Sequence, residues 1–144
     1  GVTIQAQILV LPGQLMQQLE TSIFMITHDL GVIAEMATRV VVMYAGRVAE
    51  EAPVRELFKD PRHPYTRGLL GSIPAVGRRK SQKHRKLQEI SGIVPDLKNL
   101  PRGCRFHPRC SEKRPICEEQ DPPKIKLGPF REVTCWLEAE GGRD

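Results

Sequence analysis

Residues 22–51 read SIFMITHDLGVIAEMATRVVVMYAGRVAEE, and this stretch decides the expected fold. Its first part, residues 22–27, is a continuous apolar run rich in β-branched residues, which is typical of a strand covered on both faces in a parallel sheet. His28 follows at once. Ligands of open parallel sheets bind outside the carboxyl ends of the strands, where a neutral imidazole can donate a hydrogen bond to a phosphate or hold an attacking water. His28 is therefore a candidate site residue, although such a histidine more often caps a helix or fills a polar pocket.

The remainder of the stretch predicts a helix and a hairpin. Asp29 suits the N-cap of a helix that runs to Thr38. Residues 40–43 are predicted as the next strand, and residues 44–47 (YAGR) as a turn in which Gly46 takes a positive φ. Val48 continues the returning strand. The buried stripe of the helix is expected to consist of Leu30, Ile33 and Met36 or Ala37.

Further helices flank this stretch. Pro53 opens a helix that runs through Phe58, and another is expected at residues 66–72. Residues 2–11 and 14–20 read as helical on either side of a break at Pro12-Gly13. The predicted fold class is α/β, with parallel strands and helices that end in a β-hairpin, followed by a small irregular Cys-rich extension.

Charge divides the chain into two parts. Residues 1–77 carry 6 Lys/Arg and 7 Asp/Glu, whereas residues 78–144 carry 16 and 10, together with all four cysteines. The expected domains are residues 1–76, a basic linker at 77–88, a four-cysteine extension at 89–138 and a tail at 139–144. The apolar runs are far shorter than the roughly 20 residues that span a bilayer, and no secretory leader is recognisable. We therefore expect a soluble intracellular chain, and its start at GVTIQAQIL suggests the middle of a longer sequence.

Four segments together carry a family resemblance: TIQAQIL, ITHDLGVIAEMATRVVVMYAGRVAE, HPYTRGLL and GCRFHPRC. The chain resembles the ATP-binding subunits of ABC transporters for oligopeptides and dipeptides, in the peptide and nickel branch, from Val2 to Leu137 except near residues 77–88. The resemblance implies that His28 is the switch histidine that contacts the γ-phosphate of ATP. It also places residues 1–3 at the end of the D-loop, where Gly1 stands in place of the usual Asp, and Pro12-Gly13 interrupts a helix that is usually unbroken.

Three elements of nucleotide hydrolysis are missing from the sequence. It contains no G-x-x-x-x-G-K phosphate loop followed by Ser or Thr, no LSGGQ-like signature and no strand ending in Asp-Glu. Without them, the electrostatic stabilisation that phosphoryl transfer requires cannot be assembled. We expect the chain to be inactive alone and to be the C-terminal portion of a protein that uses ATP and Mg²⁺.

The cysteine spacing is Cys104-x5-Cys110-x6-Cys117-x17-Cys135, and several ligation states are open. Structural zinc usually has a tighter C-x₂₋₄-C pair, two disulfides suit a secreted domain, and free thiols remain an alternative. Four thiolates on Pro-rich loops suit a [4Fe–4S] cluster, and the resemblance favours this cofactor on Cys104, Cys110, Cys117 and Cys135. The basic residues near them fit an anionic site or a solvated surface equally well: Arg105, Arg109, Lys113 and Arg114. His107 is interpreted as structural.

Two further stretches have ordinary interpretations. The basic run from Arg78 to Lys86 is more typical of a solvated linker than of a membrane contact, and a nucleic-acid partner is not expected because no aromatic residue interleaves with the charges. The segment DPRHPYTRGLL, with His63, Tyr65 and Arg67, is interpreted as a Pro-bounded loop before a helix whose Leu69 and Leu70 pack inward. The resemblance offers a regulatory or dimer-facing role for this segment instead.

The sequence thus predicts part of an ATP-hydrolysing subunit of a peptide importer. The implied partners are a second ABC ATPase subunit, membrane permease subunits and, indirectly, a peptide-binding protein, and the implied location is the cytoplasmic face of the membrane, as a peripheral protein. The alternative is a stand-alone metal or iron–sulfur module without nucleotide activity.

Overall fold

The computed structural model describes residues 14, 18–73 and 90–139 of the chain. It divides into two compact units, Gly1–Thr38 and Arg39–Asp144. Several predictions concern residues outside the described ranges: the helix at residues 2–11, the D-loop position at residues 1–3, the break at Pro12-Gly13 and the basic linker. Within the described residues, no helix combines the length and the apolar character needed to cross a membrane.

The described residues of the first unit include the helix α2 (Leu30–Met36). Asp29 caps it as predicted, because its Oδ1 accepts from the backbone N–H of Gly31 at 2.9 Å and of Val32 at 3.2 Å. These bonds satisfy two of the amides that a helix N-terminus leaves without partners. The expected stripe of α2 is half-buried rather than buried.

The predicted strand at residues 22–27 is wrong for this structure. The segment has no strand assignment, and its apolar side chains face solvent, with Phe24 87% and Ile26 89% exposed. A strand needs a neighbour that supplies ladder hydrogen bonds, and within the described ranges no other strand pairs with these residues. High β-propensity alone is therefore insufficient here.

The predicted hairpin opens the second unit and is confirmed. Strand β1 (Arg39–Tyr44) pairs antiparallel with β2 (Arg47–Pro53), with Val40 opposite Ala52. The turn places Ala45 at φ 45° and Gly46 at φ 79°, the left-handed conformation that favours glycine. The register shifts between Val42 and Met43, so β2 gains an extra residue near Ala49.

A second hairpin, which the sequence analysis missed, completes the sheet. Strands β3 (Lys124–Gly128) and β4 (Arg131–Thr134) lie between the third and fourth cysteines, and β4 pairs with β2 through Glu50–Val133 and Glu51–Glu132. The order is β1-β2-β4-β3, and each of these pairings is antiparallel. The expectation of parallel strands is therefore not met in the described residues, and part of the supposedly irregular extension is regular sheet.

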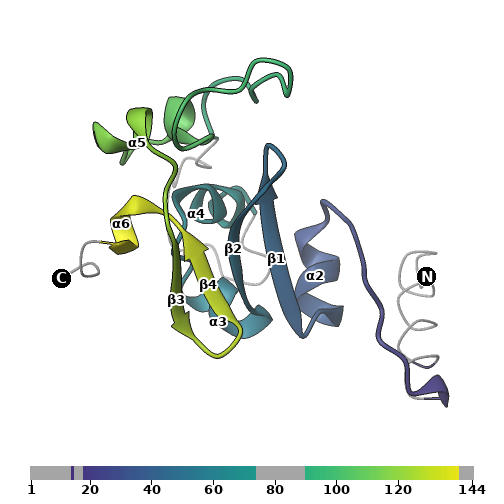
Figure 1. Ribbon diagram of the computed structural model, residues 1–144. Helices are drawn as coiled ribbons and strands as arrows, with labels where there is room; N and C mark the ends of the chain where they lie inside the picture. Colours follow the sequence, from purple (N-terminus) through teal and green to yellow (C-terminus); the bar gives the residue numbers. More distant parts are fainter. Residues whose placement is uncertain (1–13, 15–17, 74–89, 140–144) are drawn as a thin grey trace, which may run out of the picture. The chain divides into compact units, whose positions relative to one another are not determined.

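Helices cover one face of this sheet (Figure 1). Helix α3 (Val54–Lys59) begins after Pro53, which is its N-cap, and α4 (Pro64–Gly71) follows a short loop. Leu57 of α3 is 1% exposed, and the buried strand residues include Val40, Ala52 and Val133. Shorter helical turns occupy His107–Arg109, α5 (Ile116–Glu119) and α6 (Trp136–Ala139).

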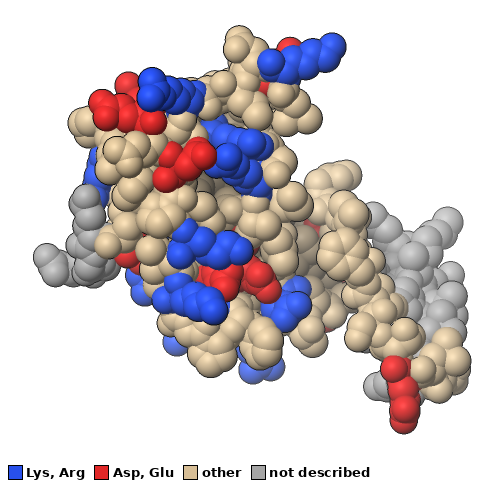
Figure 2. Space-filling view, in the orientation of Figure 1, with Lys and Arg blue, Asp and Glu red and all other residues tan. Residues whose placement is uncertain are grey.

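The opposite face of the sheet is charged. Figure 2 shows acidic and basic side chains interspersed over the strands rather than a patch of one sign. Arg39 pairs with Glu51 at 3.2 Å, and Lys124 pairs with Glu132 at 3.2 Å. Exposed pairs of this kind contribute little, roughly 0–1 kcal/mol each, so the helix-covered face supplies the main stabilisation of the sheet.

Candidate site around the four cysteines

The first two cysteines lie on a tight loop held to the third. The backbone N–H of Cys104 donates to the carbonyl of Cys117 at 2.8 Å, and the N–H of Cys110 donates to the carbonyl of His107 at 3.2 Å. Gly103 precedes this loop at φ 73°, and a Cβ there would lie 2.5 Å from the Cys117 carbonyl oxygen. Only glycine permits this approach of the two segments.

The other two cysteines are the more buried pair. Cys117 in α5 and Cys135 immediately before α6 are each 8% exposed. The Cys117 sulfur accepts a hydrogen bond from the backbone N–H of Arg114 at 3.4 Å. All four cysteines are free thiols in the structure, so the disulfide alternative is not realised.

The four sulfurs share one electrostatic neighbourhood. Burial raises the pKa of the Cys104 and Cys110 thiols, and it raises the pKa of Cys135 to about 12. Negative charge on the other three cysteines raises the pKa of Cys135 further, against a hydrogen bond from the backbone of Leu137. Without a cation to compensate them, Cys104, Cys110 and Cys135 are neutral thiols near neutral pH, and a bound metal would displace their protons.

The four cysteine thiols are chemically suited to bind a metal as thiolates. Their side chains are not arranged in a preformed metal site, however. Within residues 14, 18–73 and 90–139, no three His, Cys, Asp or Glu side chains are arranged to hold a metal ion. The residue types are those that iron–sulfur clusters and zinc prefer. The structure thus brings the sulfurs into one neighbourhood without forming the ligand geometry.

His63 lies beside the cysteine loop and performs one clear structural task. Its side chain is 3% exposed, and its Nδ1 accepts from the backbone N–H of Tyr65 at 3.0 Å, which caps α4. Pro64 occupies the first turn, where a missing N–H is tolerated. Burial and the nearby charge of Arg67 lower the pKa of His63 to about 4, so the ring is neutral. The predicted loop before a helix is correct, but His63 is a core residue of that loop.

Glu50 fixes the backbone of the same loop. It is 1% exposed, and its two carboxyl oxygens accept from the backbone N–H groups of Arg62 and His63, each at 2.8 Å. Glu50 lies opposite Val133, which is itself 1% exposed, because cross-strand neighbours share a face. The sequence analysis missed Glu50; its only signal was the Glu50-Glu51 pair, one member of which must face inward in a strand.

Aromatic rings connect the loop of His63 to the cysteine loop. Phe106, 4% exposed, packs against Tyr44 at 5.1 Å, Tyr65 at 5.4 Å and His63 at 5.7 Å between ring centroids. Tyr44 and Tyr65 meet edge to face at 4.7 Å. Such pairs contribute roughly 0.5–1.5 kcal/mol beyond their burial. Phe106 therefore anchors the first two cysteines to the hairpin.

Ion pairs make a second connection, to the last cysteine. Arg62 Nη1 lies 3.3 Å from Glu138 Oε2 in α6, and Arg62 Nε lies 3.0 Å from Asp60. Glu138 is only 7% exposed and follows Cys135 by one helical turn. The loop before α4 thus contacts the loop of Cys104 and Cys110 through His63, and the helix that follows Cys135 through Arg62.

Most of the basic residues in the cysteine region hold loops in place through hydrogen bonds or ion pairs. Arg105 donates through Nη1 to the carbonyl of Ala45 in the hairpin turn. Arg109 donates to the carbonyls of Ile90 at 2.9 Å and Ser91 at 3.1 Å. Lys113 pairs with Glu118 at 2.7 Å. The solvated-surface interpretation therefore does not describe Arg105 and Arg109, which hold loops together.

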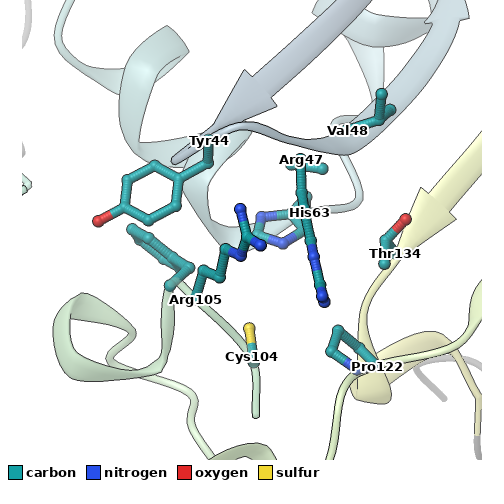
Figure 3. A pocket seen from close by; sticks show the side chains of 10 residues that line it. Tyr44, Arg47, Val48, His63, Cys104, Arg105, Pro122 and Thr134 are labelled. Atoms are coloured by element: carbon teal, nitrogen blue, oxygen red, sulfur yellow. The ribbon is translucent and has the colours of Figure 1, made fainter. Parts of the chain in front are cut away.

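A small pocket opens between the hairpin and the cysteine loop (Figure 3). Its volume is about 30 Å³, room for one or two waters. Figure 3 shows the Cys104 sulfur and the His63 ring on its wall, with Arg47 and Arg105 beside them. The remaining lining residues are Tyr44, Val48, Ala49, Phe106, Pro122 and Thr134.

His28 belongs to the first unit and is exposed. It lies between Thr27, whose Oγ1 accepts from the backbone N–H of Asp29 at 3.0 Å, and the Asp29 cap of α2. These bonds give the His28 backbone a defined start-of-helix position, and no described residue is recorded as a partner of its side chain.

Comparison with known proteins supports the family resemblance. The sequence profile of the oligopeptide/dipeptide transporter C-terminal region matches residues 49–117. This segment is similar to that C-terminal region and makes up just under half of the chain. The matched segment begins in β2 and ends at Cys117, so it contains Glu50, His63 and Phe106 as well as the first three cysteines.

Whole-chain similarity agrees with this assignment. The chain is 48% identical to the oligopeptide transport ATP-binding protein AppD of Bacillus subtilis, over 99% of this chain and 42% of the relative. It is 49% identical to OppD, another oligopeptide transport ATP-binding protein of that organism, over 94% of this chain and 37% of the relative. The dipeptide transport ATP-binding protein DppD of B. subtilis is 43% identical, over 95% of this chain and 40% of its own length. The chain therefore spans about two fifths of the length of these relatives.

Proposed function

We propose that this chain is the C-terminal part of an ATP-binding subunit of an ABC importer for oligopeptides or dipeptides. The observation that carries the proposal is similarity at 43–49% identity over 94–99% of the chain to proteins named for that transport. The chain corresponds to only part of each relative, so the phosphate loop, the signature and the Mg²⁺-binding acid would come from the rest of the full-length protein. There, ATP with Mg²⁺ would close a pair of ATPase subunits.

In the full-length protein, His28 would contact the γ-phosphate and contribute to hydrolysis. The support is chemical: an exposed imidazole directly before a capped helix can donate to a phosphate oxygen. The subunit would work with a second ATPase subunit, with permease subunits and, through them, with a peptide-binding protein. It would lie as a peripheral protein on the cytoplasmic face of the membrane.

A chimera tests this proposal. The segment of B. subtilis AppD that aligns with this chain is replaced by the chain, and uptake of a labelled oligopeptide and ATP hydrolysis are measured in cells and in membranes. We expect the chimera to restore both activities and His28→Ala to abolish both. Glu35→Ala is the matched control, because Glu35 is an exposed residue of the adjacent helix α2. A folded, membrane-bound chimera in which His28→Ala hydrolyses ATP at the control rate would refute the assigned role.

We further propose that Cys104, Cys110, Cys117 and Cys135 bind a [4Fe–4S] cluster, with Zn²⁺ as the alternative ion. The supporting observations are that all four cysteines are free thiols, the donor type that such clusters use, and that the backbone N–H of Cys104 bonds to the carbonyl of Cys117 at 2.8 Å. Bound metal would offset the burial of thiolates and hold the loops of the extension in place. We also propose that the basic stretch 77–88 is the linker that separates residues 1–76 from the four-cysteine extension at 89–138.

Metal analysis tests the cysteine proposal. The chain is purified without oxygen and its iron, sulfide and zinc contents and visible absorption are measured, with Cys117→Ser and Cys135→Ser beside it. We expect about four irons per chain and loss of the chromophore in both variants. Ser111→Ala, an exposed neighbour of Cys110, is the control that should keep the full content. One zinc and no iron would identify the alternative ion, and neither metal would refute the site.

A further inference from the structure

His28 stands between residues 22–27 and α2, and a hydrogen bond joins the two residues beside it. The Oγ1 of Thr27 accepts from the backbone N–H of Asp29 at 3.0 Å. This bond spans His28 and closes a short turn of the chain around its backbone. Asp29 has φ −87° and ψ 102°, an extended conformation from which the chain enters the helix. Thr27 and Asp29 therefore set the direction in which the His28 side chain leaves the chain.

Asp29 joins this turn to α2 through its other polar groups. Its Oδ1 accepts from the backbone N–H of Gly31 at 2.9 Å and of Val32 at 3.2 Å. Its carbonyl oxygen accepts from the backbone N–H of Ile33 at 3.2 Å. The first two bonds satisfy amides that a helix N-terminus leaves free. The same bonds hold the residue that follows His28 against the first turn of the helix.

Gly31 gives the Asp29 carboxylate its room. A Cβ at Gly31 would lie 3.2 Å from Asp29 Oδ1, closer than ordinary van der Waals contact. A side chain at this position would therefore push the carboxylate away from the amides that it caps. Glycine is otherwise a poor helix former. Its presence in the first turn favours the geometry of the cap at the expense of the intrinsic stability of α2.

The side chain of His28 has no comparable support. It is exposed, and the described residues make no hydrogen bond, ion pair or ring contact with it. A catalytic group must be held close to its productive geometry, and supporting hydrogen bonds are one means of holding it there. Among the described residues, the backbone turn at Thr27 and Asp29 is thus the support that His28 has.

We propose that Thr27 and Asp29 are positioning residues of the ATPase site, and that their hydrogen bonds orient His28 for contact with the γ-phosphate. This inference rests on the role of His28 proposed above and extends it to the residues on either side. Asp29 acts through the position of its oxygen rather than through its charge, and Asn would accept the same bonds. Thr27 acts through its hydroxyl, which Ser would keep and Val would lose.

The AppD chimera separates positioning from simple stability. The kcat and the KM for ATP are measured for Asp29→Ala and Thr27→Val, which remove the bonds, and for Asp29→Asn and Thr27→Ser, which keep them. Glu35→Gly is the matched control, because a glycine at this exposed position weakens α2 about as much as a lost cap without touching the turn. The amount of membrane-bound subunit is measured for each variant.

We expect Asp29→Ala and Thr27→Val to lower kcat by about tenfold with little change in the KM for ATP, because a catalytic group misplaced by about 1 Å can lose up to about 100-fold in rate. Asp29→Asn and Thr27→Ser should recover most of the rate, and Glu35→Gly should retain it. Gly31→Ala, which raises helix propensity but crowds the carboxylate, should lower kcat without loss of membrane-bound subunit.

Two results would overturn the positioning role. The first is a kcat for Asp29→Ala that is no lower than that of Glu35→Gly. The second is an Asp29→Asn variant as slow as Asp29→Ala, since the charge of Asp29 would then matter rather than its hydrogen bonds. Both differ from failure of the proposed role of His28, in which His28→Ala itself hydrolyses ATP at the control rate.

Discussion

Two apolar runs of this chain have similar composition, but only one of them forms a β-strand. Residues 22–27 (SIFMIT) and β1, Arg39–Tyr44 (RVVVMY), are both rich in β-branched residues. β1 pairs with β2 over its whole length and buries Val40 and Tyr44 at 8% and 6% exposure. Residues 22–27 form no ladder and leave Ile26 89% exposed. A strand therefore depends on its partner as much as on its own residues.

The hairpin supplies β1 with that partner locally, since the turn at Ala45 and Gly46 returns the chain at once. A strand of a parallel sheet cannot obtain its partner from the adjacent turn, because parallel neighbours are joined by crossovers of a dozen or more residues. Its partners must come from distant sequence. Substitutions are therefore expected to cost most at residues with many tertiary neighbours and least at residues with few.

The largest effect is expected for Leu57→Ala. Leu57 is 1% exposed beneath the sheet, and truncation of a buried leucine costs about 2–5 kcal/mol through lost burial and the cavity left behind. Denaturant titration of the chain measures the free energy of unfolding. Arg55→Ala, on the exposed side of the same helix, should change it by less than about 0.5 kcal/mol. A Leu57→Ala cost no larger than that of the control would mean that α3 does not stabilise the sheet.

The second largest effect is expected for Glu50→Ala. This change should lower the free energy of unfolding by roughly 3 kcal/mol, because it leaves the backbone amides of Arg62 and His63 without their acceptor. Glu50→Gln should recover part of this loss through its remaining carbonyl oxygen. Glu51→Gln, which removes only the pair with Arg39, is the control and should cost roughly 0–1 kcal/mol. Hydrogen exchange should locate the Glu50→Ala effect at the start of α4; uniform loosening of the whole unit would argue against a local anchor.

Acid should weaken the fold through His63. Its pKa is about 4 in the fold and 6.5 in an unfolded chain, so its contribution is present above pH 6.5 and is lost as pH falls toward 4. Between about pH 7 and about pH 5 the expected loss is roughly 2 kcal/mol. Unfolding titrations at several pH values measure it, with His63→Asn as the comparison. If the pH dependence of the variant matched that of the unsubstituted chain, another group would be responsible.

The smallest effect is expected for Ile26→Ser. The side chain is 89% exposed and belongs to a segment without a strand partner, so the free energy of unfolding should change by less than about 0.5 kcal/mol. Val40→Ser, the same kind of change at 8% exposure in β1, should cost several times more. Similar costs for both variants in denaturant titrations would show that residues 22–27 are packed in the folded chain, and the contrast between the two runs would disappear.

Local chemistry is readable from the amino-acid sequence alone. Asp29 is recognisable as a cap because its short carboxylate reaches the first free amides of a helix. Gly46 is recognisable in the turn because a positive φ favours glycine. Both signals depend on residues within a few positions of each other. The family resemblance is also visible in contiguous motifs, and the profile match over residues 49–117 and the curated relatives bear it out.

Tertiary structure alone decided the rest. Glu50 is buried because Val133, more than eighty residues later, pairs with it in β4. Phe106 is an anchor because Tyr44 and His63 meet it from two other segments. The strands β3 and β4 could not be recognised among Pro and Cys residues, since a short strand gains its stability from the sheet that it joins. The sequence by itself therefore determined caps, turns and the family resemblance, whereas burial and pairing between distant residues arose only when the chain closed its core.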